Sequence, residues 1–106
     1  MDSSRLQLLL TFLKKAPNDA FTLFSIAHEY MKKSQYSTAI TYFEQLEQID
    51  PSYVGAYYHF AKALIEINKP EDAIVVLEKG IKEAERQKDR HNLAELKSLL
   101  NELNEW

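Results

Sequence analysis

The amino-acid sequence predicts an all-α fold, built as an α-solenoid of stacked helical hairpins. Only two of the 106 residues are glycine, which is too few for phosphate-binding loops or for a fold rich in β-hairpins. No segment alternates apolar and polar residues over a sustained length, whereas several repeat apolar residues at helical spacing. Finally, residues recur at an interval of 34 positions, which is typical of a stacked-repeat protein.

Composition and charge narrow the range of functions. Hydrophobic residues make up 45% of the chain and charged residues 27%, which indicates one globular domain over residues 1–106. The net charge is −3 and both signs are interspersed, so no nucleic-acid partner is expected. The absence of cysteine excludes disulfides and thiolate metal sites and is compatible with the cytoplasm, where we expect the protein. The apolar run at 6–13 is too short to cross a bilayer, so no membrane contact is expected.

The first helix is predicted over residues 4–15. Ser4 can cap its start, and Gln7, three residues later, completes a capping box. We expect the helix to stop before Pro17, because the residue that precedes a proline is disfavoured in the helical conformation.

The second and third helices follow from similar signals. Asn18 or Asp19 can cap the second helix, which is expected to run to about Lys33. The third helix ends at Asp50 and Pro51. Its apolar residues, at the i, i+3, i+4, i+7 spacing of one helix face, are Ala39, Ile40, Phe43 and Leu46.

Residues that favour helix starts and helix ends also delimit the last three helices. Ser52 is expected to cap the fourth helix, which ends near Asn68, a residue that tolerates the left-handed conformation of a helix stop. Pro70 suits the first turn of the fifth helix. A break at 88–89 separates this helix from a sixth over residues 90–105.

The 34-residue repeat defines two units, at 20–53 and 54–87, and it resembles the tetratricopeptide repeat family. That family has the pattern W-x₂-L-G-x₂-Y, then A-x₃-F, then P. The first unit matches it with Leu23, Ile26, Ala27, Tyr30, Ala39, Phe43 and Pro51, and the second with Tyr57, Phe60, Ala61, Leu64, Ala73 and Leu77. Glu85 replaces the second proline, so the fifth helix is expected to run about one turn longer. By this resemblance the first helix is half a repeat and the sixth helix is a C-terminal cap.

The resemblance implies a non-enzymatic protein–protein interaction module that needs no cofactor. In this family a concave surface commonly binds a peptide or a helix of a partner protein. The residues that would line it here are Phe24, His28, Met31, Tyr58, His59, Lys62 and Ile65. Phe24, His28 and His59 stand where chaperone-binding members carry lysine and asparagine, so the carboxylate clamp is absent. The predicted surface is aromatic and apolar with a basic edge. Alternatively, the Phe24 and Tyr58 rings are half-buried and fill gaps between helices.

The first helix presents a second candidate surface. Its apolar arc covers about 200°, wider than a surface helix needs, because Leu8 and Phe12 lie outside the main stripe. We expect these two residues to contact a second copy, in a homodimer or a larger self-assembling scaffold, or another partner. The alternative is that they fold against the second helix near Phe21.

A third interpretation is that the protein is an enzyme, with its histidines forming a metal or catalytic site, and the sequence disfavours it. The histidines are His28, His59 and His91, with no pair at H-x₃-H spacing on one helix. No nucleophile motif such as G-x-S-x-G is present. We therefore expect no metal and no catalytic residue. Whether the chain's own Trp106 end occupies the concave surface is left open by the sequence.

Overall fold

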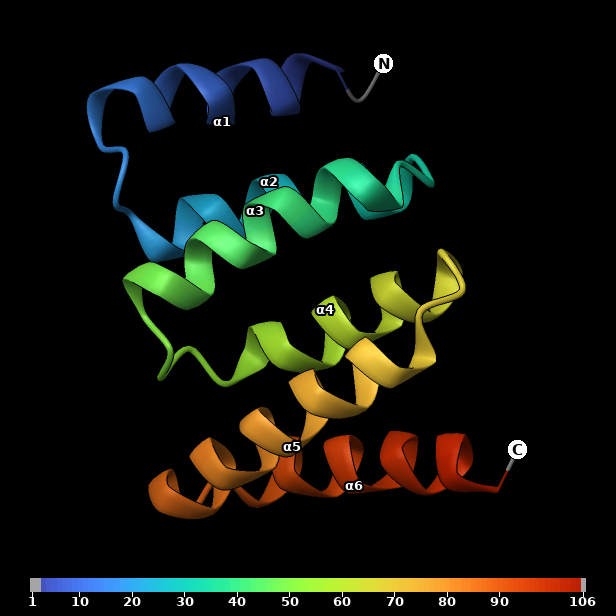
Figure 1. Cartoon of the computed structure of the whole chain (residues 1–106). Coiled ribbons are helices and arrows are strands. Elements are labelled where there is room, and N and C mark those ends of the chain that lie inside the picture. Colours follow the sequence, from blue (N-terminus) through green and yellow to red (C-terminus); the bar gives the residue numbers. More distant parts are fainter. Residues whose placement is uncertain (1–2, 106) are drawn as a thin grey trace. The chain divides into compact units, whose positions relative to one another are not determined.

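The computed structural model describes residues 3–105, and over that range it contains six helices and no strand (Figure 1). The helices are α1 (Ser3–Lys15), α2 (Ala20–Lys32), α3 (Tyr36–Ile49), α4 (Gly55–Glu66), α5 (Pro70–Gln87) and α6 (Arg90–Asn104). The all-α prediction is therefore confirmed, and every predicted helix is present within a few residues of its expected bounds.

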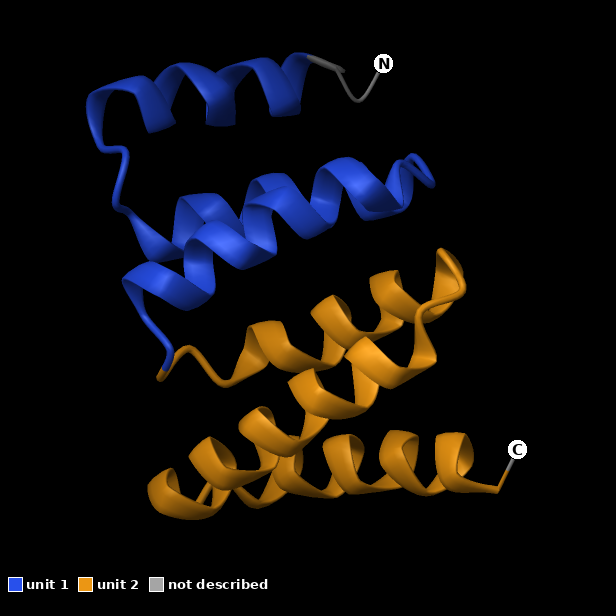
Figure 2. Ribbon diagram, in the orientation of Figure 1, with its two compact units in different colours: residues 1–51 blue, residues 52–106 orange. Residues whose placement is uncertain are grey.

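The chain divides into two compact units, residues 1–51 and 52–106 (Figure 2). In unit 1, α1 and α3 both pack on α2. In unit 2, α4, α5 and α6 all contact one another. The largest fully buried side chains are Leu23, Ile26, Phe43 and Leu46 in unit 1, and Leu77 and Leu96 in unit 2. These residues have the apolar spacing that predicted the helices, so each unit is held together by the burial of one face of each helix.

Local side-chain chemistry sets several helix ends as predicted. Asp19 caps α2, and its carboxylate accepts a hydrogen bond from the backbone N–H of Thr22 at 3.0 Å. Asn68 ends α4 in the left-handed region with φ of 63°, as expected. Ser34, which lies 34 residues earlier, has φ of 60° after α2. The repeat therefore recurs in backbone conformation as well as in residue type.

Two predicted caps differ from the structure, and one predicted extension is confirmed. Helix α1 begins at Ser3, so Ser4 lies within the helix and does not precede it. Helix α4 begins at Gly55 after a turn, so the prediction that Ser52 caps it is wrong. The Ser52 carbonyl instead accepts a hydrogen bond from the Gln87 side chain at 2.7 Å. Gln87 is the last residue of α5. Helix α5 has 18 residues, whereas α3 has 14, so α5 is longer by about one turn, as predicted.

A buried carboxylate fixes α1 on α2. Glu29 of α2 is 2% exposed, and its Oε2 lies 3.0 Å from Nε of Arg5 in α1. Nζ of Lys32, one turn along α2, lies 3.0 Å from the same oxygen. Burial alone would raise the pKa of Glu29, but the hydrogen bonds from Lys32 and Arg5 outweigh it and hold the pKa below its ordinary value. The charge pair thus favours one position of α1 along α2.

This arrangement predicts an acid-sensitive contribution of Glu29 to stability. A folded-state pKa below the ordinary 4.5 means that the carboxylate stabilises the fold above that value, and that the stabilisation is lost as the pH falls through the folded pKa. The Glu29→Gln variant should therefore be less stable than wild type at about pH 7, with the difference fading towards about pH 3. Urea denaturation at both pH values measures this. Glu44→Gln, at an exposed position of α3, is the control, and a Glu29→Gln effect equal at both pH values would contradict the account.

Candidate functional site

The residues predicted to bind a partner are distributed over both units. Phe24, His28 and Met31 lie on α2 in unit 1, where all three are half-buried. The others, Tyr58, His59, Lys62 and Ile65, lie on α4 in unit 2. Lys62 is exposed, whereas the other three are half-buried.

In unit 1, Phe24 is engaged in packing. Its ring stacks on His28 with 6.1 Å between ring centroids. The same ring meets Phe43 of α3 edge-on at 6.5 Å, and Phe43 is 1% exposed. Phe24 therefore helps to hold α2 on α3. This is the packing role that the sequence left open for Phe24 as the alternative to partner binding.

In unit 2, Tyr58 lies among polar and aromatic neighbours. His59 meets its ring edge-on at 5.6 Å between centroids. Nζ of Lys62, one turn further along α4, lies 5.9 Å from the centre of the Tyr58 ring. That distance is within the range of a cation–π interaction, so the face of this ring attracts an ammonium group.

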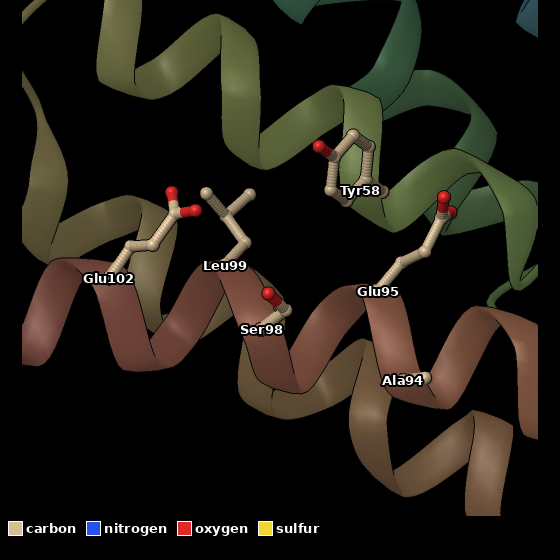
Figure 3. Close-up of a pocket in the computed structure, with 6 residues that line it drawn as sticks. All are labelled: Tyr58, Ala94, Glu95, Ser98, Leu99 and Glu102. Carbon is tan, nitrogen blue, oxygen red and sulfur yellow. The ribbon is translucent and has the colours of Figure 1, made fainter.

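A cavity of about 320 Å³ lies between Tyr58 of α4 and one face of α6; we call it the Tyr58 cavity (Figure 3). Its lining consists of Tyr58, Ala94, Glu95, Ser98, Leu99 and Glu102. In Figure 3 the carboxylates of Glu95 and Glu102 extend from α6 towards α4, and the Tyr58 ring and Leu99 lie between them. Leu99 is 5% exposed, so the cavity combines an apolar floor with an aromatic wall and two acidic edges.

Two carboxylates border the Tyr58 cavity. The sequence predicted a basic edge, to which Lys62 belongs, but Glu95 and Glu102 also border the cavity. Glu95 Oε2 lies 3.8 Å from Nε2 of His91, one turn earlier on α6. The interpretation of residues 90–105 as a cap missed these carboxylates. They could have been identified because α6 has the position of the first helix of a further unit, as α2 and α4 have in theirs, and the first helices were expected to line the surface.

On α1, the structure removes one of the two interpretations of Leu8 and Phe12. The exposed fractions are 73% for Leu8 and 50% for Phe12, and Phe21 on α2 is itself 64% exposed. The alternative that Leu8 and Phe12 fold against α2 near Phe21 is therefore wrong. With Ile49 of α3, four large apolar side chains in the described part of unit 1 are exposed.

Two of the histidines pack against identified neighbours. Among residues 3–105, no group of three or more His, Asp or Glu side chains is arranged to hold a metal ion. His28 is stacked on Phe24, and His91 faces Glu95. Trp106 lies outside the described residues. None of the described helices is both long enough and apolar enough to span a membrane.

Comparison with known proteins identifies the repeat. A family model described as Tetratricopeptide repeat matches residues 30–103. The crystal structure of a tetratricopeptide repeat domain protein from Salinibacter ruber is 34% identical, covering 81% of this chain and 96% of that chain with a TM-score of 0.77. A solution structure of a tetratricopeptide repeat domain protein from Salinibacter ruber is also 34% identical, with 82% and 88% covered and a TM-score of 0.76.

A protein from Bordetella parapertussis shares the fold at 21% identity, with 94% of this chain and 87% of that chain covered and a TM-score of 0.82. No curated protein matches this chain. The family model spans more than half of the sequence, and the predicted all-α tetratricopeptide fold is confirmed. This chain of helical hairpins belongs to the tetratricopeptide repeat family.

Proposed function

We propose that this chain is a non-enzymatic interaction module that binds a peptide or a helix of a partner protein at the Tyr58 cavity. Tetratricopeptide domains are in general protein-interaction modules and non-catalytic scaffolds. The observation that carries the proposal is the cavity between α4 and α6, where an aromatic ring and an apolar floor lie between two carboxylates. Such a combination of apolar area and a few charged groups is typical of sites that bind side chains.

The chemistry of the cavity favours a partner that carries a lysine or arginine beside an apolar side chain. The apolar part would pack on Tyr58 and Leu99, and the cation would pair with Glu95 or Glu102. A cavity of about 320 Å³ holds only one or two side chains, so moderate affinity is expected.

The other predicted residues would extend this surface. His59 and Ile65 lie on the same helix as Tyr58, and we propose that they contact the flanking part of the bound segment. Phe24, His28 and Met31 would make a corresponding surface on α2 in unit 1. The proposal requires no cofactor and no metal, and its setting is the cytoplasm.

Replacing Tyr58 by alanine should weaken peptide binding at least tenfold, a loss of about 1.4 kcal/mol. The probe is a peptide selected for binding to the wild-type chain from a displayed random library, and isothermal titration measures its affinity. Selected peptides should be enriched in lysine or arginine next to an apolar residue. Tyr36→Ala, a tyrosine on α3, is the matched control and should bind as wild type does. Equal affinities of the Tyr58→Ala and Tyr36→Ala variants would contradict the proposal that the peptide binds at Tyr58.

Self-association through α1 is a second candidate function. It is favoured by the exposure of Leu8 at 73% and Phe12 at 50%, on a helix whose remaining leucines are at least partly buried. A second copy of the chain or another partner would bury these side chains, and removing that apolar area from water would stabilise the contact.

A further inference from the structure

The ammonium group of Lys62 lies beside the Tyr58 cavity, on the side of α4. Its Nζ is 5.9 Å from the centre of the Tyr58 ring, and this ring is part of the cavity lining. Lys62 is one turn after Tyr58, so its side chain reaches back towards the start of α4, which is the usual direction of a side chain on a helix. Lys62 is also exposed. A positive charge is therefore present at the α4 side of the cavity and accessible to a partner.

The α6 side of the cavity carries the opposite charge. Glu95 and Glu102 are its two charged lining residues, and both carboxylates extend towards α4 (Figure 3). Within residues 3–105, neither carboxylate forms an ion pair with Lys62. Glu95 faces His91 on its own helix at 3.8 Å, a pair that is charged only when the histidine is protonated. Positive and negative charges thus border one cavity from two helices without neutralising each other.

The other charged groups of α4 do not cancel the charge of Lys62 at this position. Glu66, the last residue of α4, lies eight residues after Tyr58, which is about 12 Å along a helix. The Lys62 side chain extends in the opposite direction, over the Tyr58 ring. His59, which meets that ring edge-on, adds positive charge when it is protonated. The charge at the α4 side of the cavity is therefore positive.

These charges determine which group of a partner fits at each side of the cavity. A partner's ammonium or guanidinium group over the Tyr58 ring would approach the Lys62 ammonium to within about 6 Å, where like charges repel. A partner's carboxylate at the same place would be attracted and would form a charge-assisted hydrogen bond with Lys62. At Glu95 and Glu102 the preference is the reverse. An apolar side chain between the two charges would pack against Leu99.

We propose that Lys62 is a specificity-determining residue of the Tyr58 cavity. It selects a partner segment with an acidic side chain towards α4, a basic side chain towards α6 and an apolar side chain between them. This selection rests on the proposed function of the cavity, and adds to it the acidic residue and the order of the two charges. A segment bound in the reverse direction would bring like charges together on both helices, so the charges also set the direction of binding.

A charge exchange between the protein and a peptide tests this role. The first probe, the acidic peptide, is one selected for binding to the wild-type chain from a displayed random library. The second, the lysine peptide, is the same peptide with its acidic residue changed to lysine. In isothermal titration, wild type should bind the acidic peptide about tenfold more tightly than the lysine peptide, and Lys62→Glu should reverse this preference. Selected peptides that carry no acidic residue would overturn the role of Lys62.

Two further variants separate the local charge of Lys62 from other effects. Lys97→Glu makes the same change in net charge on α6, at an exposed position that lines a different cavity, between α5 and α6, so it should keep the wild-type preference. Lys62→Met removes the charge and keeps the length of the side chain, so it should abolish the preference for the acidic peptide. Both positions are exposed, and circular dichroism checks that the variants fold.

The outcomes distinguish the role of Lys62 from the proposed function itself. Binding that is lost in Tyr58→Ala, but that keeps the same preference for the acidic peptide in wild type and Lys62→Glu, would overturn the role of Lys62 and leave the cavity as the binding site. A preference lost equally in Lys62→Glu and Lys97→Glu would do the same, because net charge alone would explain it. Binding that is unaffected by Tyr58→Ala, or a library that yields no binding peptide, would overturn the proposed function together with this role.

Discussion

Replacing Phe43 by alanine is expected to destabilise unit 1 by roughly 3–5 kcal/mol, the cost of truncating a well-packed buried phenylalanine. Phe43 is 1% exposed, and its ring meets Phe24 of the neighbouring helix at 6.5 Å. A loss of this size approaches the whole stability of a small domain, which is about 5–15 kcal/mol. Urea denaturation followed by circular dichroism measures it. The variant should lose its helicity at a much lower urea concentration than wild type.

Phe21→Ala is the matched control for this experiment. Phe21 is a phenylalanine of the same unit, but it is 64% exposed, so its truncation should change the free energy of unfolding by no more than about 0.5 kcal/mol. Comparable losses in the two variants would mean that α3 does not pack on α2 through Phe43.

Replacing Gly80 by alanine is expected to destabilise unit 2 by roughly 1–2 kcal/mol, against the helix propensity of alanine. In a helix interior, glycine to alanine usually gains about 1 kcal/mol. At Gly80, however, a Cβ would lie 2.6 Å from Cβ and 2.9 Å from Cγ of Tyr57. These atoms are close to the backbone of α4, so the helices must separate, and such overpacking costs roughly 1–3 kcal/mol. Thermal and urea denaturation give the sign directly.

Gly55→Ala serves as the control with the opposite sign. A Cβ at Gly55 meets no other atom within 4 Å, so alanine should leave unit 2 unchanged or stabilise it by up to about 1 kcal/mol. If both alanine variants were stabilised alike, the close approach of α5 to α4 at Gly80 would be refuted.

The helices and their repeat were predictable because their causes are local in sequence. The cap at Asp19 depends on a hydrogen bond to Thr22, three residues away. The extra turn of α5 follows from the glutamate at position 85 in place of a proline. The cap predicted at Ser52 failed because α4 begins at Gly55, and the Ser52 carbonyl accepts a hydrogen bond from Gln87, 35 residues along the chain. A propensity rule does not include such a distant partner.

The candidate site was only partly predictable, since it depends on how helices rotate when they pack. The resemblance to the tetratricopeptide repeat family implied that Tyr58 lines the concave surface. It could not show that Glu95 and Glu102 border the same cavity, because that requires α6 to lie against α4 in one orientation. The exposure of Leu8 was equally undetermined, since the apolar pattern of α1 is the same whether or not a neighbouring helix covers it.

The most direct test of the proposed function is to map the bound peptide on the protein by nuclear magnetic resonance. The wild-type chain, labelled with ¹⁵N, is titrated with a peptide selected from a displayed library. We predict that the largest amide shifts lie in α4 around Tyr58 and in α6 from Glu95 to Glu102, and that they disappear in the Tyr58→Ala variant. Shifts confined to other helices, and unchanged in that variant, would contradict the proposal that the Tyr58 cavity is the binding site.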